Sequence, residues 1–177
     1  MAALVKTRDE LPPVLAHFYR LGASRNGWLA YTSLPGESRL DRARLMEAGL
    51  DVEGLEAAGR FVMAEIDLSL EPAAWIGPWV EQLNAAVQAG YTAMWFARFP
   101  IAPGQGDVVA VRPFEAAWMA QFAGKPVVTL CPYVVGGLDE VALGVRAREI
   151  GRTHDRVDRV VAGRLAPLTD LAPPGRG

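Results

Sequence analysis

Short apolar runs alternate along the chain with longer segments whose apolar positions recur at helical spacing. The runs are rich in β-branched and aromatic residues, which favour strands, and most are continuous rather than alternating in polarity. Continuous apolar strands are typical of a parallel sheet that is covered on both faces. The pattern therefore predicts an α/β protein with a mostly parallel, doubly wound sheet and helices on both faces. The predicted strands lie at 27–33, 60–67, 91–98, 126–131 and, at an edge of the sheet, 157–161.

Proline, glycine and capping residues set the boundaries of the predicted helices. The segment 7–10 resembles a capping box ahead of Pro12 and Pro13, so a first helix is expected to end near Gly22. Pro113 is expected in the first turn of a later helix, because its missing N–H costs little there. The other helices are predicted at 38–49, 52–58, 72–89 and, after the Gly-Gly pair at 136–137, up to Ile150.

The segment Pro126-Val-Val-Thr-Leu-Cys-Pro-Tyr133 is interpreted as a buried strand that stops at Pro132. This places Cys131 and Tyr133 at its carboxyl end, which in an open α/β sheet faces the crevice where ligands bind. Arg98 ends the strand at 91–98, and the strand at 27–33 contains a tyrosine. We therefore predict a ligand-binding site formed by Tyr31, Arg98, Cys131 and Tyr133.

These side chains also have ordinary structural interpretations. A catalytic Cys131 needs a histidine, a cation or a helix N-terminus to lower its pKa, and the sequence places neither His17 nor His154 beside it. A small buried strand residue is therefore the favoured interpretation of this cysteine. Arg98 can bind a carboxylate or a phosphate, or it can form a structural ion pair. Tyr133 can bind a ligand or cover the core, and both sets of alternatives stay open.

Two of the five tryptophans lie four residues apart on the helix predicted at 72–89. Trp75 and Trp79 would share one face of that helix with Leu83 and Val87. Such a stripe packs against a sheet or forms an exposed interface for a partner. The usual amphipathic pattern favours core packing.

Composition narrows the classes of function. The 177 residues suit one domain, predicted at 1–163, with a flexible tail at 164–177. A net charge of −2 gives no general attraction to nucleic acid or to anionic membranes, and no apolar run is long enough to span a bilayer. The single cysteine excludes an intramolecular disulfide and a multi-cysteine metal site, and it fits a cytoplasmic location.

Motifs for nucleotide phosphates are missing. The sequence contains neither G-x-x-x-x-G-K-[ST] nor G-x-G-x-x-G, so the chain lacks the recognisable backbone cradle and lysine that hold phosphates. ATP hydrolysis is therefore not expected. No cofactor and no metal are expected either, and an enzymatic function is not favoured.

Four segments resemble the MEDS domain, a sensory domain found in methanogens, methylotrophs and many other bacteria. They are Trp28–Ser33, Glu47–Val52, Leu55–Val62 and Pro126–Tyr133, and Arg152-Thr-His154 resembles the closing segment of the family. The resemblance covers most of residues 5–161. It implies a RecA/KaiC-like fold that has lost ATP hydrolysis. It also implies sensing of small molecules, often hydrocarbon derivatives, with the signal passed to kinase, anti-sigma or DNA-binding modules.

The chain departs from the family pattern in two places. Members usually begin with a strand that carries a histidine, often a cysteine, and a final aromatic residue, whereas Met1–Lys6 has none of these. Members often have a Gly-Glu pair where this chain has Arg98-Phe99. The departures imply a different ligand or a protein partner alone, and they leave open whether the first residues form a strand.

The leading hypothesis is a stand-alone, non-catalytic sensory or regulatory domain that binds a small, fairly apolar ligand. No effector module is attached, so the signal is expected to pass through a partner protein, and homodimerisation is an expectation by analogy with RecA-like proteins. One alternative is a protein-interaction module without a ligand. The other is a small enzyme that uses Cys131 or Tyr133.

Overall fold

Seven strands form one sheet in the computed structural model, which describes residues 1–67, 69–101, 108–161 and 164–168. The strand order is β3-β2-β4-β5-β1-β6-β7, and neighbouring strands are parallel except for β6 and β7. This arrangement confirms the predicted doubly wound α/β architecture. The strands are β1 (Ala2–Val5), β2 (Trp28–Ser33), β3 (Phe61–Glu65), β4 (Met94–Arg98), β5 (Val127–Val134), β6 (Val157–Val161) and β7 (Arg164–Pro167).

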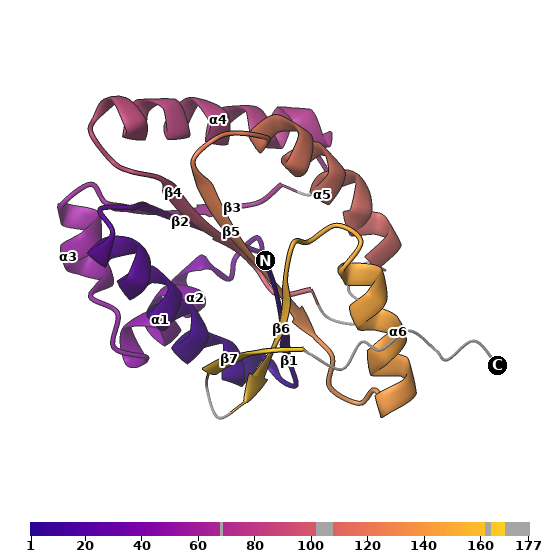
Figure 1. Ribbon diagram of the computed structural model, residues 1–177. Coiled ribbons are helices and arrows are strands. Elements are labelled where there is room, and N and C mark those ends of the chain that lie inside the picture. The colour runs from indigo at the N-terminus through magenta and orange to yellow at the C-terminus, as the bar shows by residue number, and fades with distance from the viewer. Residues whose placement is uncertain (68, 102–107, 162–163, 169–177) are drawn as a thin grey trace.

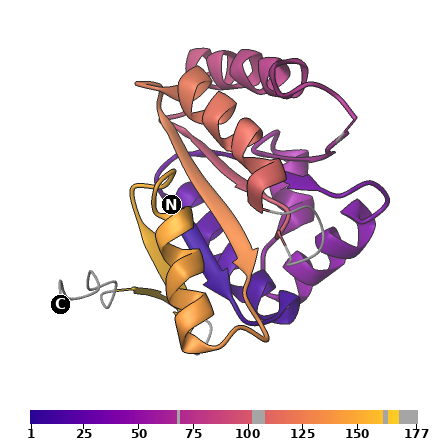
Figure 2. The ribbon, with the colours of Figure 1, turned by 90° about the vertical axis from the view of Figure 1, so that its right-hand side faces the viewer.

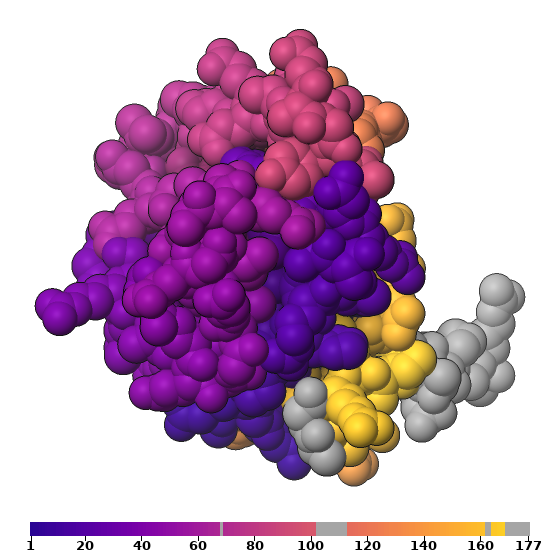
Figure 3. Space-filling model, turned by 90° about the vertical axis from the view of Figure 1, so that its left-hand side faces the viewer, coloured from indigo at the N-terminus to yellow at the C-terminus, as the bar shows by residue number. Residues whose placement is uncertain are grey.

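Helices cover both faces of the sheet (Figure 1). One face carries α1 (Leu11–Ser24), after a short 3-10 turn at Arg8–Glu10, together with α2 (Ser38–Glu47) and α3 (Val52–Ala57). Figure 3 shows the molecule from this side, where the N-terminal segments lie beside the C-terminal strands in yellow. The other face carries α4 (Pro72–Gln88), α5 (Val108–Phe122) and α6 (Glu140–Ile150).

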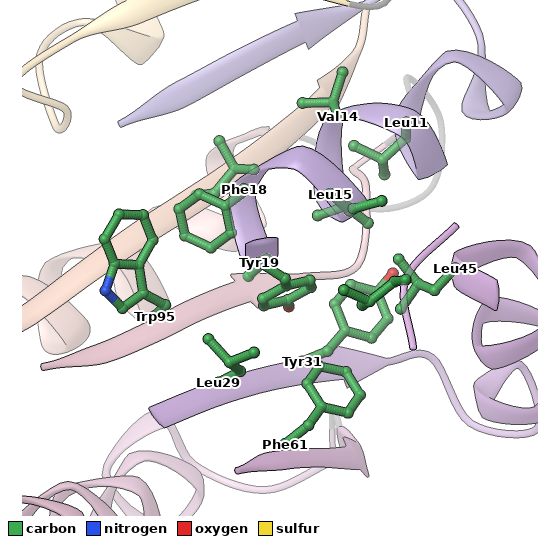
Figure 4. Packing of buried hydrophobic residues seen from close by; sticks show 14 of the residues in the cluster. Leu11, Val14, Leu15, Phe18, Tyr19, Leu29, Tyr31, Leu45, Phe61 and Trp95 are labelled. Carbon is green, nitrogen blue, oxygen red and sulfur yellow. The ribbon is translucent and has the colours of Figure 1, made fainter. Parts of the chain in front are cut away.

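The main core lies between α1 and the sheet (Figure 4). Phe18 of α1 contacts Trp95 of β4, and Tyr19 contacts Phe61 of β3, in each case with ring centroids between 5.0 and 5.2 Å apart. Tyr19 is fully buried, and its hydroxyl donates a hydrogen bond of 2.8 Å to the carbonyl oxygen of Ala30. Each such side chain contributes about 1.5–3 kcal/mol through removal of its apolar surface from water. This face is therefore the packed foundation of the fold.

The first strand answers the question that the sequence left open. Ala2–Val5 is a strand, all four residues are buried, and it lies between β5 and β6 in the interior of the sheet. Its short apolar side chains fit a central strand that is covered on both faces. The segment therefore forms a central strand without a histidine or an aromatic residue.

The prediction that the β5 strand stops at Pro132 is wrong, because β5 continues through the proline to Val134. On the side of β1, the N–H of Cys131 donates a hydrogen bond to the carbonyl oxygen of Met1. On the opposite side of β5, the N–H of Val134 donates a hydrogen bond of 2.8 Å to the carbonyl oxygen of Ile101. The N–H that Pro132 lacks would point to that opposite side, where β4 has already ended at Arg98. Proline is tolerated here because β4 presents no backbone acceptor opposite the missing N–H.

Two further boundaries differ from the predictions. The α5 helix begins at Val108, so Pro113 lies inside the helix instead of in its first turn. The predicted edge strand β6 is not the edge, because Arg164–Pro167 form β7 antiparallel to it. The predicted flexible tail thus began too early, and its remaining part at 169–177 lies outside the described residues.

We expect Gly27→Ala to destabilise the protein by about 1–3 kcal/mol, the usual cost of overpacking a dense core. A Cβ atom there would lie 2.8 Å from the carbonyl oxygen of Gly22 and closer still to the Trp95 ring. Urea denaturation measures the change in the free energy of unfolding. Gly144→Ala is the control: it lies inside α6, where a Cβ atom meets only the end of Arg148 at 3.9 Å, and it should stabilise by about 0.5–1 kcal/mol. Equal effects of both substitutions would contradict this account.

Candidate functional site

A cavity of about 260 Å³ lies on the face of the sheet that α4, α5 and α6 cover. Its floor comes from β4, β5 and the residue that precedes β1, and its walls come from α4, α5 and the segment after α6. Figure 2 shows β5 between α5 and α6 on this side. Most of the lining is apolar, and a cluster of polar side chains around Arg98 lies at one end. The lining residues are Met1, Ile66, Trp75, Phe96, Arg98, Phe99, Ile101, Phe114, Glu115, Trp118, Met119, Thr129, Cys131, Thr153, His154 and Asp155.

Strand register brings Arg98 and Cys131 together in the floor of the cavity. Ala97 of β4 pairs with Leu130 of β5. The residues that follow them, Arg98 and Cys131, therefore lie side by side on the two neighbouring strands, and both point to the opposite face of the sheet from that pair. Cys131 in turn pairs with Ala2 of β1, whose small side chain leaves room beside the thiol. The polar end of the cavity is therefore set by the parallel register of three central strands.

Arg98 is a buried cation with unused hydrogen-bonding capacity. Its Nη2 donates a hydrogen bond of 2.8 Å to Oε1 of Glu115 on α5, and both side chains are only 9% exposed. Its guanidinium carbon lies 4.9 Å from the centre of the Tyr133 ring. Nε and Nη1, which together carry three N–H groups, make no further hydrogen bond of good geometry to the described residues, although the guanidinium also interacts with the thiol of Cys131. Arg98 therefore retains donors for a further acceptor beside the cavity that it lines.

Glu115 holds the polar groups in place around Arg98. Besides the guanidinium, Glu115 accepts hydrogen bonds from the hydroxyl of Tyr133 and, at 3.0 Å, from Oγ1 of Thr153. Burial raises the pKa of Tyr133 above its ordinary value, so the phenol remains a donor. Thr153 Oγ1 also lies 3.0 Å from Nδ1 of His154. One carboxylate thus links β4, β5, α5 and the segment after α6.

The electrostatics of Cys131 favour its thiolate. Burial is the largest influence and raises the pKa, but Arg98 and His154 oppose it and lower the pKa to about 7. For His154, burial lowers the pKa, and the interaction with Cys131 more than compensates, so the pKa is raised. A thiolate beside an imidazolium and a guanidinium is a nucleophile in the form that reacts.

Tyr31 lies apart from the other three predicted site residues. It pairs with Ala97 in the register of β2 and β4, so it points to the face covered by α1–α3, away from Arg98. There its hydroxyl lies 3.3 Å from Oδ2 of Asp41. Tyr133 lies next to the polar side chains of the cavity: its hydroxyl donates a hydrogen bond to Glu115, and its ring lies against the Arg98 guanidinium. The structure therefore brings Arg98, Cys131 and Tyr133 together, and their contact with a ligand stays a prediction.

The tryptophan stripe of α4 contributes to both the core and the cavity. Trp79 is 3% exposed and packs against Phe96 with ring centroids 5.2 Å apart, as core packing predicts. Trp75 lines the cavity and contacts Trp118 of α5 at 6.0 Å. Trp118 also donates a hydrogen bond of 3.0 Å to Oγ1 of Thr129. Tryptophan side chains therefore form much of the apolar wall.

Sequence reasoning missed Glu115 and understated His154. Glu115 is 17 residues from Arg98 along the chain and belongs to no motif, so nothing in the sequence marks it as a partner. The sequence does not place His154 beside Cys131, and the side chain bonds locally, with Nδ1 lying 3.0 Å from the carbonyl oxygen of Ile150. The same side chain also lines the cavity and acts on Cys131. The one available signal was strand alternation, which places Phe96, Arg98, Thr129 and Cys131 on one face.

Metal and membrane chemistry receive no support from the described part of the chain. No group of three or more His, Cys, Asp or Glu side chains in it is placed to hold a metal ion. None of its helices is both long and apolar enough to cross a membrane.

Comparison with known proteins identifies both a family and a fold. The family model described as MEDS, MEthanogen/methylotroph, DcmR Sensory domain, matches residues 1–155. No curated protein matches the chain. Among solved structures, the chain is similar to an uncharacterized protein from Pyrococcus horikoshii in complex with an unknown peptide. The TM-score is 0.60 at 12% identity, over 89% of this chain and 76% of that one.

A second similar structure is a KaiC-like protein from the hyperthermophilic archaeon Pyrococcus horikoshii OT3. Its TM-score is 0.54 at 11% identity, over 89% of this chain and 69% of that one. Identities this low show the fold alone. They confirm the predicted RecA/KaiC-like fold.

We expect the rate at which methyl methanethiosulfonate modifies Cys131 to rise with pH through a midpoint near 7, because the reagent attacks the thiolate. In His154→Gln the midpoint should move up towards the ordinary thiol pKa of about 8.5, since the imidazolium is gone. His17→Gln, which changes an exposed histidine on α1, should leave it unchanged. Initial rates followed by intact-protein mass spectrometry give the midpoints. A wild-type midpoint at or above that of His154→Gln would contradict the proposed electrostatics.

Proposed function

Because this chain belongs to the MEDS family of sensory domains, we propose that the molecule it senses binds in the cavity between β4, β5 and α5. Two features support this location. Arg98 lines the cavity as a buried cation, and most of the cavity surface is apolar. Small-molecule sites are commonly apolar pockets with a few convergent polar groups. The buried Arg98 guanidinium in the wall of a largely apolar cavity is the observation that carries the proposal.

The dimensions of the cavity suggest the kind of ligand. At about 30 Å³ for each molecule of liquid water, 260 Å³ corresponds to about nine water molecules. Aromatic and aliphatic side chains would surround most of such a ligand, so its body would be apolar. Arg98 retains N–H donors on two nitrogens, so an oxygen acceptor on the ligand would have a charged donor available. A small, largely apolar molecule with one oxygen acceptor fits best.

We expect cyclohexanone to produce a saturable change in tryptophan fluorescence, because Trp75 and Trp118 line the cavity. Cys131→Leu should weaken this binding by roughly tenfold or more, since the added bulk would occupy space beside Arg98. His17→Gln, which changes an exposed residue of α1 on the opposite face of the sheet, is the control and should bind as the wild type does. Linear, non-saturable fluorescence changes in all three proteins would count against a ligand site in this cavity.

We also propose that the bound state is passed to a partner protein through α6. The segment that lines the cavity with Thr153 and His154 follows directly from this helix. On the outward side of α6, Val141 and Val145 are 77% and 46% exposed and lie four residues apart. A ligand that orders the segment after α6 would therefore act on a helix that presents apolar surface to a partner.

Amide hydrogen exchange tests this coupling without knowledge of the partner. With cyclohexanone bound, slower exchange is expected in residues 147–155, because the ligand contacts the segment after α6 and fixes the last turn of the helix. Residues 38–47 of α2 lie on the opposite face of the sheet and provide the internal control. Protection confined to β4, β5 and α5, with α6 unchanged, would show that binding is not transmitted through α6.

A further inference from the structure

Three groups with complementary chemistry meet at the polar end of the cavity. Cys131 supplies a thiol whose pKa is about 7, and it is the only cysteine of the chain. Arg98 supplies a guanidinium that is 9% exposed, interacts with the Cys131 thiol and retains further N–H donors on Nε and Nη1. His154 supplies an imidazole whose Nδ1 faces the carbonyl oxygen of Ile150. A carbonyl oxygen only accepts hydrogen bonds, so Nδ1 carries the proton there and Nε2 remains for the thiol.

We propose that this site reacts covalently with small, apolar α,β-unsaturated carbonyl compounds. The proposal rests on the ligand site proposed above and names the class of ligand. The carbonyl oxygen would accept hydrogen bonds from Nε or Nη1 of Arg98, and the apolar body would lie against Trp75, Phe96 and Trp118. The β-carbon of the compound would then face the sulfur of Cys131, which lies in the same floor on the neighbouring strand.

The reaction is an addition that needs no oxidant and releases no leaving group. The thiolate sulfur attacks the β-carbon, a carbon–sulfur bond forms, and the π electrons of the carbon–carbon double bond move into the carbonyl group. Arg98 stabilises the negative charge that develops on the carbonyl oxygen, in the manner of an oxyanion hole. The α-carbon then takes the proton of the His154 imidazolium, directly or through water. The products are a neutral thioether and a neutral imidazole.

The charges around the cavity favour a neutral carbonyl compound over an acid. Arg98 and His154 can supply two positive charges, which Glu115 and the Cys131 thiolate balance. A carboxylate ligand would add a negative charge to an apolar cavity without a further cation, and Asp155 already stands at its rim. Burying such an unpaired charge is costly. A neutral carbonyl would accept a hydrogen bond from Arg98 and leave the charges balanced.

The test uses 2-cyclohexen-1-one and the saturated cyclohexanone as a matched pair of probes. Intact-protein mass spectrometry should show one addition to the purified protein, with an observed rate that saturates as the enone concentration rises. Peptide mapping should place the adduct on Cys131, and Cys131→Ser should abolish it. At low enone concentration the rate should exceed that of N-acetylcysteine at the same pH by roughly tenfold or more, because the carbonyl is held by a charged donor.

The role of Arg98 is isolated by comparing two reagents. Methyl methanethiosulfonate has no carbonyl group, so the ratio of its rate to the enone rate separates thiolate availability from carbonyl binding. Arg98→Met should lower the enone rate by roughly tenfold relative to the thiosulfonate rate. Because that variant leaves Glu115 buried without its partner, Arg98→Met/Glu115→Gln removes both charges and serves as a second variant. Thermal melting shows which variant is folded.

The outcomes separate this inference from the ligand site itself. If cyclohexanone binds saturably but the enone reacts no faster than with N-acetylcysteine, the covalent inference is overturned and the ligand site stands. A rate ratio that is the same in wild type and in a folded Arg98 variant also overturns it. If neither ketone binds and no adduct forms, both the covalent inference and the proposed carbonyl ligand fail.

Discussion

The ion pair between Arg98 and Glu115 is the interaction on which the functional half of the molecule depends. It joins the end of β4 to α5, and through Glu115 it also holds Tyr133 of β5 and Thr153 after α6. Removing one partner of this buried pair should lower the free energy of unfolding by about 3–5 kcal/mol, because the other charge is left uncompensated. The two wall elements, α5 and the segment after α6, are therefore held by the same ion pair. The cavity lies between the elements that this anchor joins.

The fold was predictable from the sequence because its signals are local. Continuous apolar runs and helical spacing identified the parallel sheet and the helices, and the segments shared with the sensory family agreed with them. Errors arose where tertiary context outweighs a local rule. Pro132 does not end β5, because the neighbouring strand has already ended on the side of its missing N–H. The first strand has no motif of its own, and pairing with β5 and β6 gives it its place.

The site was predictable only in part, for a geometric reason. The rule for strand ends singled out Arg98, Cys131 and Tyr133, which the structure brings together, but it does not say to which face a side chain points. Alternation along β2 and β4 directs Tyr31 to the α1 face and Arg98 to the opposite one. Glu115 could not be found, because a buried acid on a helix acquires its meaning only when the helix is docked against its cation. The constellation is a property of the packed layers.

The two faces of the sheet differ in a way that bears on how such a domain can diversify. The α1 face is densely packed, with aromatic contacts among Phe18, Tyr19, Phe61 and Trp95, and it carries much of the burden of stability. The opposite face holds a cavity, where a changed side chain alters empty space more than it disturbs close packing. Substitutions in the cavity wall can therefore accumulate while the scaffold stays folded. One framework can in this way acquire new chemical preferences, and Arg98 and Phe99 in the cavity wall are positions where such a change would act.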